Sequence, residues 1–127
     1  MFPCKKRILI IDEYGFSRIC SAILEVEGYS TETISNIDNL PLRLKNNDFG
    51  LILISYPYGN YLLDEIKKWN ISTIILSDNL NEELIALLKG FVKSYCMIKP
   101  LDYDKFKILI KQVMNTDFNV CSGFSII

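Results

Sequence analysis

Short apolar runs alternate with stretches of helical spacing along the whole chain. The runs 8–11, 51–54, 71–76 and 95–98 consist mainly of apolar residues. Runs of this length are typical of strands that are buried on both faces of a sheet. The segment 30–34 is rich in β-branched residues but partly polar, which predicts a further strand at the edge of the same sheet.

The first helical stretches lie between these strands. The stretch 16–27 has an apolar face that is marked by Ile19, Ile23 and Val26 and widened by Phe16, Cys20 and Leu24. Gly28 follows at the place where a left-handed C-terminal cap belongs. A weaker helix is predicted over 40–46, where Pro41 fits only the first turn.

Three further helices are predicted in the second half of the chain. They are marked by Leu62, Ile66 and Trp69, by Leu84, Leu87, Leu88 and Phe91, and by Phe106, Leu109, Ile110 and Val113. We expect Asn79 or Asn81 to cap the helix that contains Leu84, because the side chains of Glu82 and Glu83 suit the positive end of its dipole.

Strands that alternate with helices in this way predict an α/β fold. We expect a doubly wound, five-stranded parallel sheet with helices on both faces. Right-handed crossovers leave few topologies, and the strand order 2-1-3-4-5 of flavodoxin-like folds fits the pattern. This domain occupies residues 1–115. Residues 116–127 have no helical period and are expected to be a tail: a docking segment, a linker remnant or a disordered end.

Composition excludes several classes of function. The chain has 127 residues, which suits one domain, and a formal net charge of −1, without the basic excess of proteins that bind nucleic acid or anionic membranes. It contains no histidine, so Ser-His-Asp triads, Cys–His pairs and histidine-ligated metals are excluded. No apolar run approaches the length of a membrane span, and the N-terminus lacks a signal-peptide cleavage site.

The cysteines point to a reducing compartment. Cys4, Cys20, Cys96 and Cys121 form no C-x-x-C pair, and their wide spacing does not suit a small disulfide scaffold. We expect reduced thiols in a cytoplasmic protein. Cys20 and Cys96 fall in apolar surroundings and are expected in the core.

Polar residues follow the predicted strands. Asp12 and Glu13 follow the first strand, Ser55 the third, Ser77 the fourth and Lys99 the fifth. Because parallel strands in such folds end at one rim, these side chains are expected to converge there. An acidic pair suits Mg²⁺, and a lysine with a hydroxyl suits phosphoryl oxygens.

At these positions the sequence resembles the receiver domain of bacterial two-component response regulators. The motifs that carry the likeness are Ile-Leu-Ile-Ile-Asp-Glu at 8–13, Leu-Glu-Val-Glu-Gly-Tyr at 24–29, Asp-Phe-Gly-Leu-Ile-Leu-Ile at 48–54, Ile-Ile-Leu-Ser at 74–77 and Ile-Lys-Pro-Leu at 98–101. The likeness spans residues 6–114. It implies a signalling domain of a phosphorelay, in which an aspartate at the end of the third strand accepts phosphate from a histidine kinase.

The chain departs from the family at this phosphate-accepting position, which is Ser55. An acyl phosphate needs a carboxylate nucleophile, and a serine hydroxyl without a neighbouring base is a poor replacement. We therefore expect no phosphotransfer at this degenerate position. The resemblance implies that Ser77 and Lys99 are the phosphate-contacting positions and that the bond between Lys99 and Pro100 is cis.

Two further segments depart from the family. The loop after the third strand is shortened and carries Tyr56, Tyr58 and Tyr61, which suit either a partner-binding patch or packing of the loop itself. The family's switch aromatic, three residues before the lysine, is replaced by Cys96. Tyr95 lies one position away and so points to the other face of the strand.

These residues together predict a pseudo-receiver that is not an enzyme and acts as a phosphorylation-independent signalling or protein-interaction module. Asp12 and Glu13 are expected to hold Mg²⁺ weakly at most, and no other cofactor is expected. We expect Lys99 to form an ion pair with Asp12 or Glu13.

The expected partners are proteins, a second copy of the chain among them. By family resemblance they dock on the fourth helix, fifth strand and fifth helix. One alternative is the receiver half of a DNA-binding regulator, which would touch nucleic acid only through a separate output domain. Another is a domain of the same fold that binds flavin or a small ligand. That would need a hydroxyl- and glycine-rich phosphate loop, for which residues 13–17 are a poor candidate.

Overall fold

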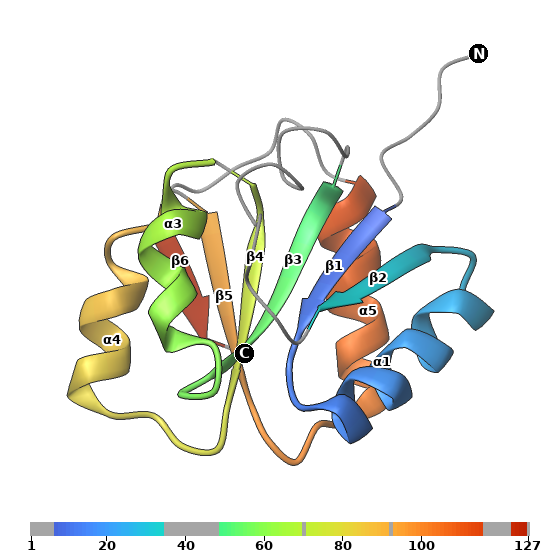
Figure 1. Ribbon diagram of the computed structural model, residues 1–127, viewed down its shortest axis with the longest axis horizontal. Coiled ribbons are helices and arrows are strands. Elements are labelled where there is room, and N and C mark those ends of the chain that lie inside the picture. Colours follow the sequence, from blue (N-terminus) through green and yellow to red (C-terminus); the bar gives the residue numbers. More distant parts are fainter. Residues whose placement is uncertain (1–6, 35–48, 70, 92, 116–122, 127) are drawn as a thin grey trace.

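The computed structural model describes residues 7–34, 49–69, 71–91, 93–115 and 123–126 (Figure 1). Its strands are β1 (Arg7–Ile11), β2 (Ser30–Ile34), β3 (Phe49–Tyr56), β4 (Thr73–Ser77), β5 (Lys93–Ile98) and β6 (Gly123–Ile126). Its helices are α1 (Tyr14–Val26), a 3-10 turn η1 (Asn60–Leu62), α3 (Leu63–Lys67), α4 (Glu82–Leu88) and α5 (Tyr103–Asn115). The helix predicted over 40–46 lies outside the described residues.

The strands form one parallel sheet in the order β2-β1-β3-β4-β5-β6. The predicted order of the first five strands is therefore confirmed. The sixth strand was not predicted. Residues 123–126 of the expected tail pair with β5, in a register that sets Ser94 against Phe124 and Cys96 against Ile126.

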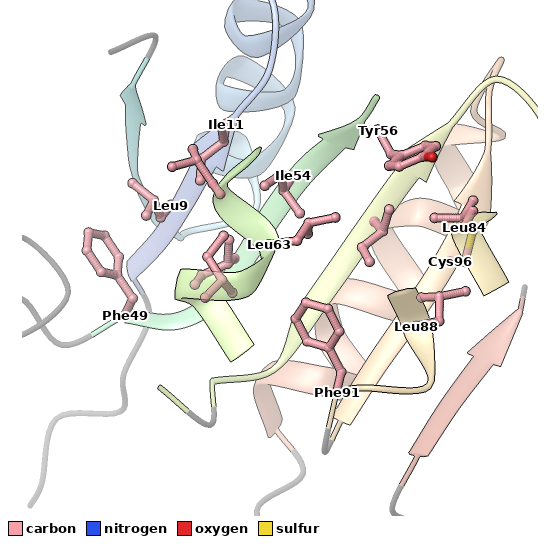
Figure 2. Close-up of a cluster of buried hydrophobic side chains, with 14 of the residues drawn as sticks. Leu9, Ile11, Phe49, Ile54, Tyr56, Leu63, Leu84, Leu88, Phe91 and Cys96 are labelled. Atoms are coloured by element: carbon pink, nitrogen blue, oxygen red, sulfur yellow. The ribbon is translucent and has the colours of Figure 1, made fainter. Parts of the chain in front are cut away.

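Helices cover both faces of the sheet, with α3 and α4 on one side and α1 and α5 on the other (Figure 1). Successive strand residues point to opposite faces. In β1, Leu9 and Ile11 join the cluster under α3 and α4 that Figure 2 shows, whereas Ile8 and Ile10 join the cluster under α1 and α5. Because both faces bury apolar side chains, the runs are continuous rather than alternating.

Helix α1 corrects one prediction about its apolar face. Ile19 and Val26 are 48% and 83% exposed, although the spacing places them on the buried face. The side chains that α1 buries include Ser17, Cys20 and Leu24. The prediction was wrong because it relied on apolar residues to mark the buried face, whereas that face includes the polar Ser17. Its hydroxyl can nevertheless be buried, because it donates a hydrogen bond of 3.0 Å to the carbonyl of Asp12.

The helix ends agree with the sequence signals. Asn81 caps α4, since its side-chain oxygen accepts a hydrogen bond of 2.8 Å from the Leu84 amide. Gly28, after α1, has the positive φ of 98° that its predicted capping role requires. The four apolar residues predicted for the last helix are all buried on α5: Phe106, Leu109, Ile110 and Val113.

Candidate functional site

The carboxyl end of β1 places Asp12 at the rim of the sheet. Only 2% of Asp12 is exposed. One carboxylate oxygen, Oδ1, accepts a hydrogen bond of 2.6 Å from the Glu13 amide. Asp12 is therefore a buried acid with one oxygen committed to the chain itself, whereas Glu13 points to solvent.

Lys99, which follows β5, reaches the other oxygen of this carboxylate. Its Nζ lies 3.2 Å from Asp12 Oδ2 and donates a hydrogen bond of 3.3 Å to Ser55 Oγ. The same Nζ lies 4.2 Å from the centre of the Phe16 ring, a distance typical of a cation–π contact. An ammonium group has three N–H donors, and these contacts occupy it from three sides. The ion pair predicted for Lys99 is thus confirmed, and its partner is Asp12.

The backbone beside Lys99 fixes its position. The Lys99 amide donates a hydrogen bond of 2.7 Å to the Ser77 carbonyl at the end of β4. The bond between Lys99 and Pro100 is cis, as the family resemblance implied. The end of β5 is therefore anchored to β4, and the lysine side chain projects across the ends of the strands toward β1.

Ser55 lies near the end of β3 and is buried. Its hydroxyl accepts the hydrogen bond from Lys99, which also donates to the Asp12 carboxylate. A lysine that donates to a carboxylate is a hydrogen-bond donor to the serine and not a base for it. Within the described part of the chain, the side-chain partner of the Ser55 hydroxyl is therefore a donor and not the base that an activated nucleophile needs.

Magnesium was predicted to bind weakly at most, through Asp12 and Glu13. Both oxygens of Asp12 already accept hydrogen bonds, and the Lys99 charge lies 3.2 Å from one of them. No group of three or more His, Cys, Asp and Glu side chains suited to a metal occurs within the described part of the chain. Mg²⁺ usually binds through one or two carboxylates and keeps several waters, so at Asp12 the ion would have to compete with the Lys99 ammonium.

Ser77 is brought to the rim but is turned away from this cluster. Its hydroxyl donates a hydrogen bond of 2.6 Å to the carbonyl of Asn79, in the loop that leads to α4. On the neighbouring strand, Cys96 is buried in the cluster of Figure 2, and Tyr95 packs against the cluster on the opposite face. Tyr95 therefore points to the opposite face of β5 from Cys96, as its position in the strand predicted.

The three tyrosines after the third strand do not act as one group. Tyr58 and Tyr61 are exposed, as a partner-binding patch would require. Tyr56 is buried beside Leu84 (Figure 2), and its hydroxyl donates a hydrogen bond of 2.7 Å to Glu83 on α4. This hydrogen bond to a carboxylate raises the pKa of Tyr56, and burial of the ring adds to the effect.

The loop after Tyr56 is a close turn. The bond between Tyr56 and Pro57 is cis, and the Gly59 amide donates a hydrogen bond of 2.7 Å back to the Ser55 carbonyl. A Cβ at Gly59 would lie 2.7 Å from Cγ1 of Ile54, so only glycine fits without displacing the Ile54 side chain. The shortened loop is therefore held against the end of β3.

The two described thiols, Cys20 and Cys96, are free and buried, as predicted. Burial and, to a smaller extent, the nearby Asp12 carboxylate raise the pKa of the Cys20 thiol to about 12, although the Lys99 charge acts in the opposite direction. Burial also raises the pKa of Cys96.

Among the described helices, none is long and apolar enough to cross a membrane.

Comparison with known proteins places the fold. No protein-family model and no curated protein matches the chain. Among solved structures, the chain is similar to a two-component response regulator from Clostridium difficile, at 21% identity and a TM-score of 0.75, over 87% of this chain and 99% of that one. It is also similar to the response regulator TrrA from Thermotoga maritima in complex with Mg²⁺-BeF, at 20% identity and a TM-score of 0.69, over 85% of this chain and 98% of that one.

A further similar structure is the beryllofluoride-activated receiver domain dimer of NtrC4. It matches at 24% identity and a TM-score of 0.70, over 86% of this chain and 96% of that one. At these identities the likeness establishes the fold. The chain has the receiver fold of response regulators, as its motifs indicated.

Proposed function

We propose that this chain is a receiver-type signalling module that works through protein contacts and without aspartyl phosphorylation. The observation that carries the proposal is the Asp12–Lys99–Ser55 cluster. Lys99 binds a carboxylate at 3.2 Å and a serine hydroxyl at 3.3 Å, at the position where the family resemblance places an aspartate.

The charge balance of the cluster supports this proposal. Asp12 carries one negative charge and Lys99 one positive charge, and Ser55 adds none. A buried ion pair that is hydrogen-bonded on both sides needs no further ion to neutralise it. With an aspartate at 55, two carboxylates would face one ammonium, and the excess charge would favour a bound cation. The serine thus removes the electrostatic reason for magnesium to bind.

The chemistry of Ser55 points the same way. Phosphate transfer from a phosphohistidine to a receiver requires a carboxylate nucleophile and charge stabilisation by a metal. Position 55 does not supply the carboxylate, because it is a serine whose hydroxyl accepts a hydrogen bond from a lysine that is itself paired with Asp12. The domain is accordingly a binding module and not an enzyme.

The first connection of the fold gives no support to a flavin site. Strand β1 ends at Ile11, and α1 begins at Tyr14. Only two residues separate them, Asp12 and Glu13, and both are acidic. A phosphate-binding loop needs backbone amides and hydroxyls around an anion, and two carboxylates would repel it.

The partners of such a module are proteins. The surface expected for them lay on α4, β5 and α5, but β6 pairs with the outer edge of β5, so the surface that we propose is this same end of the sheet with β6 as its outer strand. Receiver domains of this fold associate with one another, as in the NtrC4 dimer. A near-neutral chain has little self-repulsion, so a second copy is a suitable partner. Contact with nucleic acid would require a separate domain.

The proposal is tested by adding Mg²⁺ and beryllofluoride to the ¹⁵N-labelled chain while recording amide shifts near Asp12, Ser77 and Lys99. The native chain is expected to show no saturable shifts. The matched control is Ser55→Asp, which restores the carboxylate and should show Mg²⁺-dependent shifts at the same amides. Saturable Mg²⁺-dependent shifts in the native chain would contradict the proposal.

A further inference from the structure

The sixth strand changes the edge of the sheet. β6 pairs with β5 along one side, in parallel and over four residues. Within the described part of the chain, no strand pairs with its other side, so β6 is an outer strand (Figure 1). Its outward backbone N–H and C=O groups can therefore accept another strand.

The two outer strands of the sheet differ in how their edges are protected. Proteins commonly guard an edge strand with charged side chains or proline. β2 carries Glu32, which binds Arg7 of β1 at 2.7 Å. Residues 118–127, which include β6, contain no Asp, Glu, Lys, Arg or Pro. The edge at β6 therefore lacks the two common guards against pairing with another strand.

The missing charges also indicate the partner. When identical strands pair across a two-fold axis, each charged residue can face a charge of its own sign, which is destabilising. An uncharged strand has no such cost, and the net charge of −1 adds little long-range repulsion. The edge therefore suits a second copy of itself.

We propose that β6 pairs with β6 of a second copy, antiparallel across a two-fold axis, and joins the two six-stranded sheets into one. The inference rests on the proposed interaction role and names its partner and its surface. Because β6 spans only four residues, the contact is small, and we expect a dimer in the weak, transient class.

The test is sedimentation velocity of the full chain over a concentration series that reaches about 1 mM, where a dimer of micromolar to sub-millimolar affinity is populated. The native chain is expected to shift from monomer to dimer along the series. A chain that stays monomeric at the top of the series would overturn the inference. The magnesium titration of the native chain and Ser55→Asp is independent of this result, so failure here and failure of the proposed function are distinguishable.

Two proline variants locate the contact. Neighbouring residues of a strand direct their amides to opposite edges, so Phe124→Pro and Ser125→Pro each remove a donor from a different edge of β6. Hydrogen exchange at Tyr95 and Cys96 shows which variant leaves the β5 side intact. That variant should lose at least tenfold in dimer affinity. Unchanged association in both variants would place the contact elsewhere and overturn the inference.

Discussion

Replacement of Lys99 by methionine tests whether the ion pair is what keeps Asp12 in a buried site. The variant keeps an apolar side chain of similar length but removes the ammonium, and with it the cation–π contact with Phe16. Asp12, 2% exposed, then loses the partner that lies 3.2 Å from Oδ2 and keeps only the Glu13 amide at Oδ1. A buried carboxylate without its counter-ion is strongly destabilising.

The magnitude follows from the burial of the two partners. Removal of one member of a buried pair costs about 3–5 kcal/mol. The Lys99 side chain is 20% exposed, and one Asp12 oxygen keeps its hydrogen bond, so we expect the lower end, about 3 kcal/mol. Against a typical total of about 5–15 kcal/mol, this loss is easily measured by urea unfolding followed by circular dichroism.

A double-mutant cycle separates the charge effect from lost packing. Asp12→Asn combined with Lys99→Met removes both charges, and we expect it to recover about 2 kcal/mol of the loss. A loss below about 1 kcal/mol in Lys99→Met, the range of exposed pairs, or no recovery in the double variant, would refute the reasoning.

Two further substitutions test the loop that closes the site. Tyr56→Phe removes the hydrogen bond to Glu83 and should lower the free energy of unfolding by about 1 kcal/mol in urea titrations. Because the pKa of Tyr56 is raised on folding, the stabilisation by this hydrogen bond is present below about pH 10 and is lost at higher pH. A difference in unfolding free energy between the native chain and Tyr56→Phe that grows above about pH 10 would contradict the assignment. Gly59→Ala should cost about 1–3 kcal/mol, because its Cβ would lie 2.7 Å from Ile54 Cγ1. Gly15→Ala is the matched control, because a Cβ at Gly15 would have no atom within 4 Å, and it should not destabilise the fold. Equal losses of stability in both variants would refute the steric argument.

The strand order and most of the core could be predicted because they follow from local patterns. Continuous aliphatic runs indicate strands that are buried on both faces, and their alternation with helices leaves few topologies. The same logic placed Asp12, Ser55 and Lys99 at one rim, since parallel strands end together. Their contacts required in addition that the Lys99 side chain reach from the end of β5 past β4 to the ends of β3 and β1.

The remaining features depend on contacts between distant residues. The predicted buried face of α1 was wrong because the prediction counted apolar residues only. Ser17 is polar, and its burial depends on a hydrogen bond to Asp12. The hydrogen bond between Tyr56 and Glu83 joins residues 27 positions apart, and neither residue carries a local signal for the other. Strand β6 has only four residues, too few for a period to stand out, and its pairing with β5 is non-local.

The serine at position 55 links the site to the proposed surface. A receiver that is switched by phosphate needs a site that is electrostatically incomplete until a cation and a phosphoryl group bind. Here the Asp12–Lys99 pair is balanced at 3.2 Å, and Ser55 completes its hydrogen bonds. Under the proposed function such a site does not report a ligand by changing its charge, and regulation would act on association itself. Among the described elements, the uncharged edge of β6 is the part that we propose for that association.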